Sequence, residues 1–591
     1  MSTTEPASQK YRQKFRQLIR KALLLDPHLL VLAALIGLLA GLASTAFRWM
    51  IHFVDSIFSG ESLALIGITG SILPFVIPLI PMMGGLAIGV ICHFFPDAVK
   101  ENGVHQVMHM VALKNGRIRP RTILSASTTS AITIGSGGSA GREGPTVQIG
   151  AAVGSLIGQW LHVSTDRMRV LVGCGAAAGI AASFNAPLAG VLFAMEIILG
   201  DFTIHTFSPI VIASVIGTVT GRALEGNAVT FEVPFHELVS HTEIIFYLIL
   251  GLLCGLVASL FSTTYFKSSE FFEERVNIPK ILKPALGGLI VGLMSIAVPQ
   301  VLGNGYDAMG QALNGQMFWG LALALVFLKI LATAITLGSG GMGGIFAPSL
   351  FIGAMTGSVF GAVIHSISPQ FTASPETYAV VGMGAVAGAV MQAPLTNILM
   401  LFELTNDYTL ILPIMATCIV STYVFRGRGK ISIYIEYLLR KGINIKHGRE
   451  VSILNAIKVK DVMTKEITTI PEGMTFRRIL ETVSYSKSLY FPVVNQQGDV
   501  TGILSFSDLR EVFFEEGLDD LVIASTLATH EVVYLHPNQN LNEAMEQFAR
   551  LDIEQLPVSP EDNPRKVIGM INRGDVVAAY NREVLVHKFE R

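Results

Sequence analysis

Glu143 is an ionisable residue inside a long apolar part of the chain. It stands in the segment Gly-Arg-Glu-Gly-Pro at 141–145. A carboxyl group in apolar surroundings is costly and is retained where it takes part in function, for instance by binding and releasing a proton. The other interpretation is a buried structural glutamate that caps the start of a helix. We take Glu143 as the first candidate functional residue.

The segment around Glu143 occurs twice. Residues 135–158 and 338–361 align at a constant offset of 203, with glycines and a proline at matching places. Apolar segments broken by Gly and Pro at corresponding positions of two halves indicate a transport site built from two repeats. The two copies differ most clearly where Glu143 of the first aligns with Phe346 of the second.

Both copies predict a helix that begins in the middle of the apolar region. The sequences GREGP at 141–145 and GIFAP at 344–348 place a proline where it suits the first turn of a helix. The first N–H groups of a helix lack partners and carry the positive end of its dipole, so they can hold a small anion without a full charge. An ionised Glu143 would occupy such a position, and a protonated one would leave it open. The predicted anion-binding residues are Arg142, Gly144, Ile345, Phe346 and Ala347.

The glycines later in each copy have a different expected role. Gly150 and Gly154 correspond to Gly353 and Gly357. We expect these four to let neighbouring helices approach closely, as small residues do in membrane proteins.

Composition places most of the chain in a membrane. Of its 591 residues, 51% are hydrophobic and 15% are charged, whereas a soluble protein carries about 25% charged residues. The net charge of -2 gives no basis for nucleic-acid binding. The four cysteines lack metal or redox spacing and are expected to be small buried residues.

The apolar spans set the predicted domain boundaries. Several are shorter than the roughly 20 residues that a crossing needs, which predicts broken helices lining a pathway. Basic residues precede the first span and follow the last, so we expect a multi-pass protein of the plasma (inner) membrane with both termini cytoplasmic. The start of the chain is polar and then basic, so we expect no cleavable signal peptide. The expected parts are a cytoplasmic segment at 1–28, a transmembrane domain at 29–425 with repeats at about 29–225 and 240–425, a linker at 426–450 and a soluble domain at 451–591.

A second matching pair of segments supports the duplication. Residues 173–196 correspond to 382–403, and each segment ends in a glutamate nine positions after a proline. Because Glu196 and Glu403 occur in both halves, we interpret them as structural, capping a helix or pairing with backbone donors. The paired broken helices favour an inverted repeat.

The soluble domain is itself a repeat. FPVV at 491–494 matches LPVS at 556–559, and GILSFSDL at 502–509 matches GMINRGDV at 569–576. Strand-like runs alternate with helical ones, which predicts a small β-α-β-β-α unit made twice, at about 455–515 and 523–582. The fold class is therefore a multi-pass α-helical membrane protein followed by an α/β domain.

These motifs resemble the CLC family of chloride channels and proton-coupled chloride exchangers, with a C-terminal pair of CBS domains. GREGP resembles the motif of the family's gating glutamate, GIFAP resembles its second anion-site motif, and Tyr434 stands where the family has an anion-coordinating tyrosine. The resemblance implies a homodimer in the bilayer, with one pathway per subunit. It also implies transport of chloride or similar small inorganic anions, without enzymatic activity and without a required cofactor.

The chain departs from the family pattern at two places. The first anion motif, usually GSGIP, reads ENGVH at 101–105, so Asn102, Gly103 and Val104 are the expected anion-binding residues and strict chloride selectivity is in question. At the position of the family's intracellular proton-carrying glutamate stands Ile197, which cannot carry a proton. An apolar residue there is typical of channel-type members, so the sequence favours passive conduction. Proton exchange stays open as the alternative.

The CBS pair resembles nucleotide sensors for ATP, ADP or AMP. Asp508 and Asp575 match ribose-binding aspartates, and Ser505 and Asn572 stand three residues before them. The chain has no Gly-rich phosphate loop, so nucleotide hydrolysis is not expected. A purely structural dimerisation module is the alternative interpretation.

Two further classes of protein fit less well. An intramembrane enzyme would need a partnered nucleophile or a metal motif such as HExxH, and the apolar spans contain none. A CBS-regulated divalent-cation channel would need several acidic residues along one pathway, whereas the candidate site is rich in donors.

Overall fold

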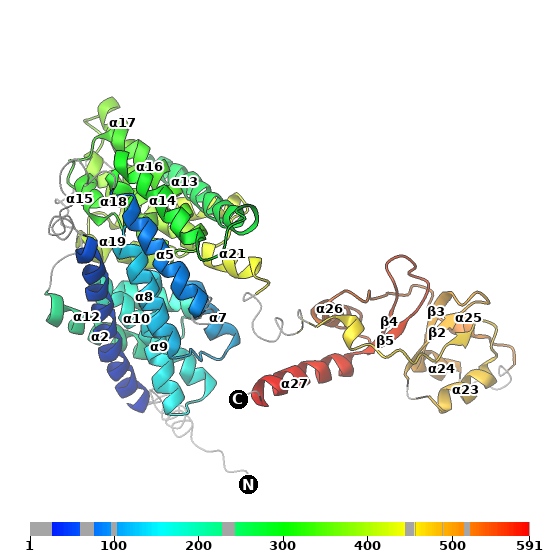
Figure 1. Ribbon diagram of the computed structural model, residues 1–591. Coiled ribbons are helices and arrows are strands. Elements are labelled where there is room, and N and C mark those ends of the chain that lie inside the picture. The colour runs from blue at the N-terminus through cyan, green and yellow to red at the C-terminus, as the bar shows by residue number, and fades with distance from the viewer. Residues whose placement is uncertain are drawn as a thin grey trace, which may run out of the picture. The chain divides into compact units, whose positions relative to one another are not determined.

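The computed structural model divides into two compact units, Met1–Ile443 and Asn444–Arg591. The division lies inside the segment expected as a linker. Each unit is described by itself (Figure 1). The described residues are 27–58, 76–95, 103–226, 243–443, 454, 457–486, 488–512 and 520–589.

The regular elements of the first unit that the structure describes are helices, apart from one isolated bridge between Gly141 and Gly344. The first repeat contains α2 (Pro27–Phe58), α5 (Leu79–Phe94), α7 (Val104–Leu113), α8 (Arg121–Gly135), α9 (Glu143–Trp160), α10 (Thr165–Phe184), α11 (Pro187–Leu192), the π-helix η2 (Phe193–Leu199) and α12 (Ile204–Glu225). The second contains α13 (Ile244–Glu270), the π-helix η4 (Phe271–Arg275), α14 (Lys283–Ala297), the 3-10 helix η5 (Pro299–Val301), α15 (Tyr306–Leu313), α16 (Trp319–Gly338), α17 (Phe346–Ile367), α18 (Pro375–Met391), α19 (Pro394–Thr405) and α20 (Ile411–Gly427). The helix α21 (Ile433–Arg440) follows the second repeat.

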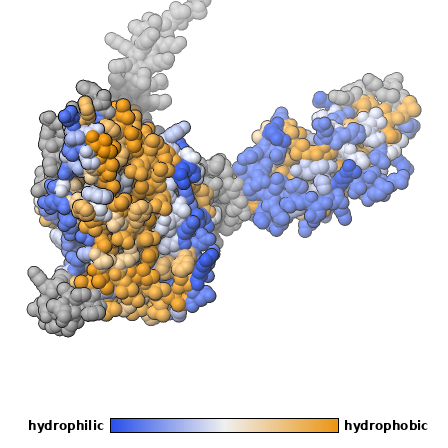
Figure 2. Space-filling view, turned by 90° about the horizontal axis from the view of Figure 1, so that it is seen from above, coloured by the Kyte–Doolittle hydropathy of each residue, from blue (hydrophilic) through white to orange (hydrophobic). Residues whose placement is uncertain are grey.

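The surface of this unit suits a lipid bilayer. Six of the described helices are long and apolar enough to cross a membrane. Figure 2 shows a face of the unit on which hydrophobic residues form a broad band with hydrophilic residues along its borders. Large apolar side chains of this unit, such as Phe53 on α2 and Leu252 on α13, are exposed. Apolar area on this scale is stable only against lipid or another apolar surface.

The two repeats are related by a two-fold axis. A Cβ added to Gly85 of α5 would lie 2.2 Å from the carbonyl oxygen of Pro284, and one added to Gly89 would lie 1.9 Å from that of Ile281. From Gly85 to Gly89 the residue number rises, whereas the number of the residue in contact falls from 284 to 281. The helices α5 and α14 therefore pack antiparallel. The contacts repeat with the roles exchanged at an offset of 203, where Gly288 meets Pro81 and Gly292 meets Pro78. Because equivalent helices run in opposite directions, the expected inverted repeat is confirmed.

Close helix packing holds the broken helices at the centre of the unit. A Cβ on Gly150 would lie 2.1 Å from the carbonyl oxygen of Gly175, so α9 and α10 touch through their backbones. In the second repeat, a Cβ on Gly353 of α17 would lie 2.2 Å from the carbonyl oxygen of Gly382 of α18. Gly154 and Gly357 make equivalent contacts with Leu171 and Tyr378. The predicted packing role of these glycines is confirmed.

The second unit contains two small cores built on the same plan. In the first, Phe491 of β2 pairs with Leu504 of β3, and in the second, Leu556 of β4 pairs with Ile571 of β5. The sheet order is β1-β2-β3 in the first copy and β4-β5 in the second. The elements are η6 (Val459–Asp461), β1 (Ile470–Pro471), α23 (Phe476–Ser484), β2 (Tyr490–Val494), β3 (Val500–Ser505), α24 (Phe506–Val512), α25 (Ala524–Leu527), α26 (Leu541–Leu551), β4 (Gln555–Val558), β5 (Gly569–Asn572) and α27 (Arg573–Phe589).

Candidate functional site

The side chain of Glu143 lies on the start of a helix from the other repeat. Glu143 is the first residue of α9 and is fully buried. Its Oε1 accepts a hydrogen bond of 2.5 Å from the backbone amide of Phe346, the first residue of α17. The carboxylate therefore occupies a position at the positive end of α17, which would also suit a free anion.

Backbone pairing brings the two helix starts together. Gly141 and Gly344 form an antiparallel bridge, in which the Gly141 amide donates to the Gly344 carbonyl at 2.8 Å and the reverse bond is 2.7 Å. These glycines are equivalent positions of the two repeats, so the two-fold axis passes between them. Threonine side chains support both turns in the same reciprocal way. The backbone amide of Ser139 donates to the Thr336 hydroxyl at 3.1 Å, and the backbone amide of Met342 donates to the Thr133 hydroxyl at 3.0 Å.

The same two glycines make room for the carboxylate. A Cβ on Gly344 would lie 2.0 Å from Oε1 of Glu143, and one on Gly141 would lie 2.1 Å from Oε2. Any larger residue would strike the carboxyl group or push it away. The glycine requirement therefore comes from a side chain, and not only from the turn.

A cavity of about 230 Å3 begins beside Glu143 and reaches Tyr434; we name it the Tyr434 cavity. The Tyr434 hydroxyl is buried and has no hydrogen-bond partner within the described residues, and the same holds for Oε2 of Glu143. Unpaired buried groups of this kind are expensive unless a ligand or water completes them. The predicted anion-binding residues that line this cavity are Gly103, Val104, Gly144, Ile345 and Tyr434. Phe346 and Ala347 are buried in the first turn of α17.

The first predicted anion motif is only partly described. Asn102 lies outside the described residues. The Gly103 amide donates to the side-chain oxygen of Gln148 at 2.8 Å, so in this structure it is used within the protein. His105, which also lines the Tyr434 cavity, packs against Tyr437 with ring centroids 4.0 Å apart.

Arg142 faces a second cavity of about 160 Å3, which we name the Arg142 cavity. Its Nη2 donates to the Ser183 carbonyl at 3.0 Å, and its guanidinium lies over the rings of Phe184 and Tyr306. Phe184 in turn makes an edge-to-face contact with Phe346. Since residue 142 lines one cavity and residue 144 lines the other, the buried Glu143 stands between them.

The sequence interpretation missed three charged residues of the Arg142 cavity. Arg48, Arg222 and Glu225 line it together with Arg142. The available signal was an arginine inside the apolar α2 and a charged end of the apolar α12. Their meeting point depends on tertiary packing, which no local pattern specifies.

Ile197 is placed away from both cavities. It lies in η2 with 7% of its surface exposed, and it does not line the Tyr434 or the Arg142 cavity.

Glu196 and Glu403 cap helices across the two-fold axis. Glu403 accepts hydrogen bonds from the amides of Leu188 and Ala189 at the start of α11, both at 2.8 Å. Glu196 accepts from Leu395 at 3.3 Å and Thr396 at 2.7 Å, at the start of α19. Glu403 of the second repeat thus caps α11 of the first, and Glu196 of the first repeat caps α19 of the second. The predicted pairing with backbone donors is confirmed.

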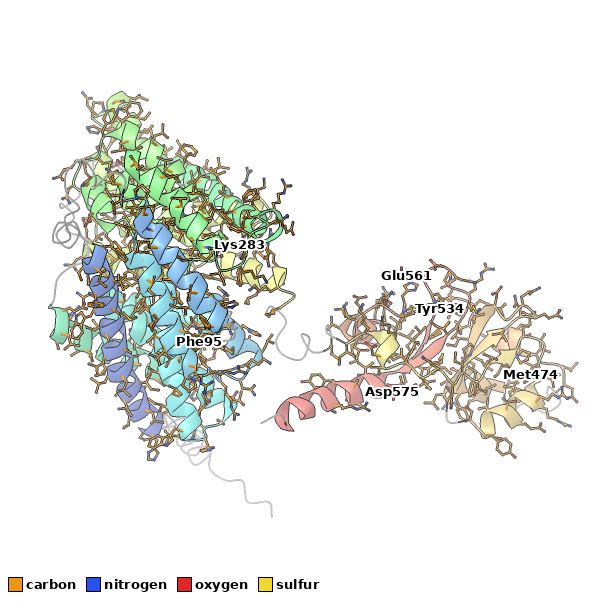
Figure 3. The ribbon with its side chains drawn as sticks, in the orientation of Figure 1. Phe95, Lys283, Met474, Tyr534, Glu561 and Asp575 are labelled. Atoms are coloured by element: carbon orange, nitrogen blue, oxygen red, sulfur yellow. The ribbon has the colours of Figure 1, made fainter. Side chains whose placement is uncertain are left out.

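The predicted nucleotide residues lie in two similar turns of the second unit. Oδ2 of Asp508 accepts from the Ser505 amide at 2.7 Å and from its hydroxyl at 2.8 Å. Asn572 donates to Asp575 at 2.7 Å, and Figure 3 labels Asp575 at the start of α27. A cavity of about 360 Å3 is lined by Ser505 and Asp508, and from the second copy by Leu551, Ile553, Gln555, Leu556 and Pro557. Neither Asn572 nor Asp575 lines it.

The described residues contain no group of three or more His, Cys, Asp or Glu side chains that could hold a metal ion.

Comparison with protein families gives two matches. Residues 84–426 match the family described as voltage gated chloride channel. Residues 459–515 and 524–582 each match the CBS domain.

Several curated proteins are similar over most of this chain. A putative chloride channel protein ClcB-like from Ralstonia nicotianae is 37% identical, over 70% of this chain and 97% of that protein. The H(+)/Cl(-) exchange transporter ClcA of Vibrio campbellii is 33% identical, over 70% and 89%. Chloride channel protein CLC-f of Arabidopsis thaliana is 30% identical, over 86% and 72%.

Solved structures share the fold. A slow cyanobacterial Cl-/H+ antiporter aligns with a TM-score of 0.65 and 28% identity, over 70% of this chain and 98% of that one. A eukaryotic CLC transporter aligns over 93% of this chain and 97% of that one with a TM-score of 0.60 and 18% identity, which speaks for the fold alone. From the motifs, the two-fold repeat and these matches, the chain belongs to the voltage-gated chloride channel (CLC) family and carries a C-terminal pair of CBS domains.

Proposed function

We propose that this protein transports chloride, or similar small anions, across a membrane in exchange for protons. Glu143 serves as the gate and as the group that carries the proton. The observation that supports this most is the 2.5 Å hydrogen bond from the Phe346 amide to the Glu143 carboxylate. A carboxylate that holds an anion position can be displaced by an anion or released by a proton, which links the two ions.

Exchange is proposed here in place of the passive conduction that the sequence alone favours. The Vibrio relative is named as an H(+)/Cl(-) exchange transporter, and the cyanobacterial structure as a Cl-/H+ antiporter. Both share at least a quarter of their residues with this chain over about two thirds of its length. These likenesses support the exchange alternative more than the channel alternative.

The proposed cycle follows from charge and space. The ionised Glu143 carboxylate takes the donors at the start of α17 and blocks passage between the two cavities. Protonation removes its charge, so the helix dipole no longer holds it and an anion can replace it. The carboxyl group then releases its proton. The ionised carboxylate returns to the start of α17 and displaces the anion. The anion is held by amides and by the Tyr434 hydroxyl, without a fixed cation that would trap it.

Passive conduction remains the second candidate because of Ile197. This side chain is buried in η2 and cannot relay a proton. If no other group takes over that step, Glu143 would gate an uncoupled flow of chloride.

We infer that the Tyr434 cavity opens to the cytoplasm. Three basic residues, Arg426, Arg428 and Lys430, stand directly before α21, which carries Tyr434. Such clusters favour the cytoplasmic side. Both termini are then cytoplasmic, the Arg142 cavity faces outward, and the protein works as a homodimer in the plasma (inner) membrane.

The second unit is proposed to bind an adenine nucleotide and to modulate transport. The supporting feature is the 360 Å3 cavity with Ser505 and Asp508 on one side. Titration of the purified full-length protein with ATP, ADP and AMP in a calorimeter tests this. Saturable heat with one of them supports binding, and no heat with all three refutes it.

The exchange proposal is tested in proteoliposomes. A chloride gradient is imposed, the membrane potential is clamped with potassium and valinomycin, and external chloride and pH are recorded together. Chloride efflux that drives proton uptake without a proton gradient supports exchange. Chloride efflux with flat pH means passive conduction.

A further inference from the structure

The Arg142 cavity contains more positive than negative charge. It is lined by the side chains of Arg48 from α2, Arg142 ahead of α9, and Arg222 from α12. Among its lining residues, Glu225 is the one carboxylate. Guanidinium groups do not lose their charge in proteins, so the cavity has an excess of two positive charges.

Two of these cations are held close together. Arg48 Nη2 donates to the Ser183 carbonyl at 2.5 Å, and Arg142 Nη2 donates to the same oxygen at 3.0 Å. Because both guanidinium groups donate to one oxygen atom, their positive charges lie close together and repel each other, the more so away from bulk water. The ion pair between Arg48 and Glu225 offsets only part of this repulsion.

Two of the arginines that line the cavity carry buried hydrogen-bond donors that nothing in the described residues uses. The Nε groups of Arg48 and Arg142 are buried and have no acceptor there. The Nε of Arg222, in contrast, donates to the side-chain oxygen of Asn185 at 2.5 Å. Buried donors without partners, next to uncompensated positive charge, favour an anion as the missing ligand.

We propose that Arg48, Arg142 and Arg222 form a capture site for a small inorganic anion at the entrance to the pathway, and that the Glu225 carboxylate competes with this anion for Arg48. The volume of about 160 Å3 has room for a chloride ion with a few waters, since each water takes roughly 30 Å3. The inference deepens the proposed function, because it assumes that the captured anion continues to Phe346.

The position next to the gate gives this site a role in transport. Arg142 directly precedes Glu143, and Phe184 joins the cavity wall to the Phe346 ring. A cluster of positive charge in a narrow cavity raises the local concentration of anions. The capture site would therefore set how much external chloride is needed for transport.

Two substitutions of opposite expected effect test the proposal. Chloride uptake is measured in right-side-out membrane vesicles over a range of external chloride concentrations. Arg222→Gln removes one positive charge and raises the external chloride for half-maximal uptake by roughly three- to tenfold. Glu225→Gln removes the competing carboxylate and lowers it. Arg117→Gln, an exposed arginine that lines neither cavity, leaves it unchanged.

The direction of the shifts separates binding from mere structure. If Arg222 and Glu225 only stabilise the fold, both variants impair uptake alike or change nothing, and the capture site is overturned. Raising the ionic strength with an impermeant salt shrinks both shifts, because exposed charges are screened. Because the experiment measures chloride uptake alone, it tests the capture site independently of proton coupling. Flat pH with both shifts present would refute exchange and keep the capture site.

Discussion

The Glu143 carboxylate accepts a hydrogen bond at 2.5 Å from the amide of Phe346, the residue that takes its own position in the other repeat. The duplication thus supplies two equivalent helix starts, and the glutamate in the first copy places a carboxylate on the first amide of the helix in the second copy. The two-fold axis explains why the carboxylate reaches this amide, because it brings Gly141 against Gly344.

Removing the charge of Glu143 should open the pathway and end its response to pH. In the parent protein, we expect acid to protonate the carboxyl group and to speed chloride flux, and alkaline conditions to slow it. Glu143→Gln keeps the shape but cannot ionise, so flux should be high at every pH. The measurement is chloride efflux from proteoliposomes at several pH values. A variant that keeps both the normal rate and the normal pH response would contradict the gating role.

Gly344→Ala should displace the gate without touching its chemistry. The added Cβ would lie 2.0 Å from Oε1 of Glu143, so the carboxyl group must move off the Phe346 amide. We expect chloride efflux to become less dependent on pH, in the direction of Glu143→Gln. Gly310→Ala is the matched control, because its Cβ meets nothing within 4 Å.

A double variant separates this steric effect from misfolding. In Glu143→Ala with Gly344→Ala, the carboxyl oxygens are gone and the nearest remaining atom is the Gly144 amide nitrogen, 2.9 Å from the added Cβ, so the second substitution should change flux much less than it does in the parent protein. Additive loss of flux would mean that Gly344 matters for the turn itself and not for the carboxylate.

Tyr434→Phe should weaken anion binding. The hydroxyl is buried in the Tyr434 cavity without a partner among the described residues, so an anion is its expected acceptor. Loss of one such hydrogen bond costs about 1–3 kcal/mol, or roughly a fivefold to hundredfold loss of affinity. Chloride titration by calorimetry measures it, with the exposed Tyr408→Phe as control. Equal affinities of variant and parent would remove Tyr434 from the site.

Glu403→Gln should lower stability without changing the pH response. The carboxylate accepts from two amides at the start of α11, and its amide replacement can accept with only one oxygen. The expected loss is about 1–3 kcal/mol, seen as a lower melting temperature in detergent. Glu196→Gln should behave alike because its contacts are the two-fold equivalent. A change in pH dependence with unaltered stability would argue for a transport role instead.

The two CBS aspartates should differ in their effect on nucleotide binding. Asp508 lines the 360 Å3 cavity and Asp575 does not. Asp508→Ala should therefore abolish the heat of adenine nucleotide binding, whereas Asp575→Ala should leave most of it. The reverse order would place the nucleotide at the second turn.

Much of the fold follows from local sequence. The offset of 203 predicted both helix starts, and the matching glycines predicted the contacts of α9 with α10 and of α17 with α18, because these depend on small residues at helical spacing. The capping role of Glu196 and Glu403 followed from their presence in both halves.

The remaining features depend on where distant segments meet. Sequence could not show that Gln148 takes the Gly103 amide, or that Arg48, 174 residues from Arg222, shares a cavity with it. It also could not show that the Asp575 turn lies outside the cavity of the second unit, since both turns read alike. Such contacts are set by the packing of whole helices and sheets.

The most direct test of the central claim is to locate the anion at the start of α17. Crystals of the parent protein and of Glu143→Gln are soaked in bromide, and anomalous scattering is measured. The account predicts bromide within hydrogen-bond distance of the Phe346 amide in the variant and a carboxylate there in the parent at neutral pH. A variant that leaves this amide without bromide, at concentrations that support transport, would contradict the competition between Glu143 and the anion.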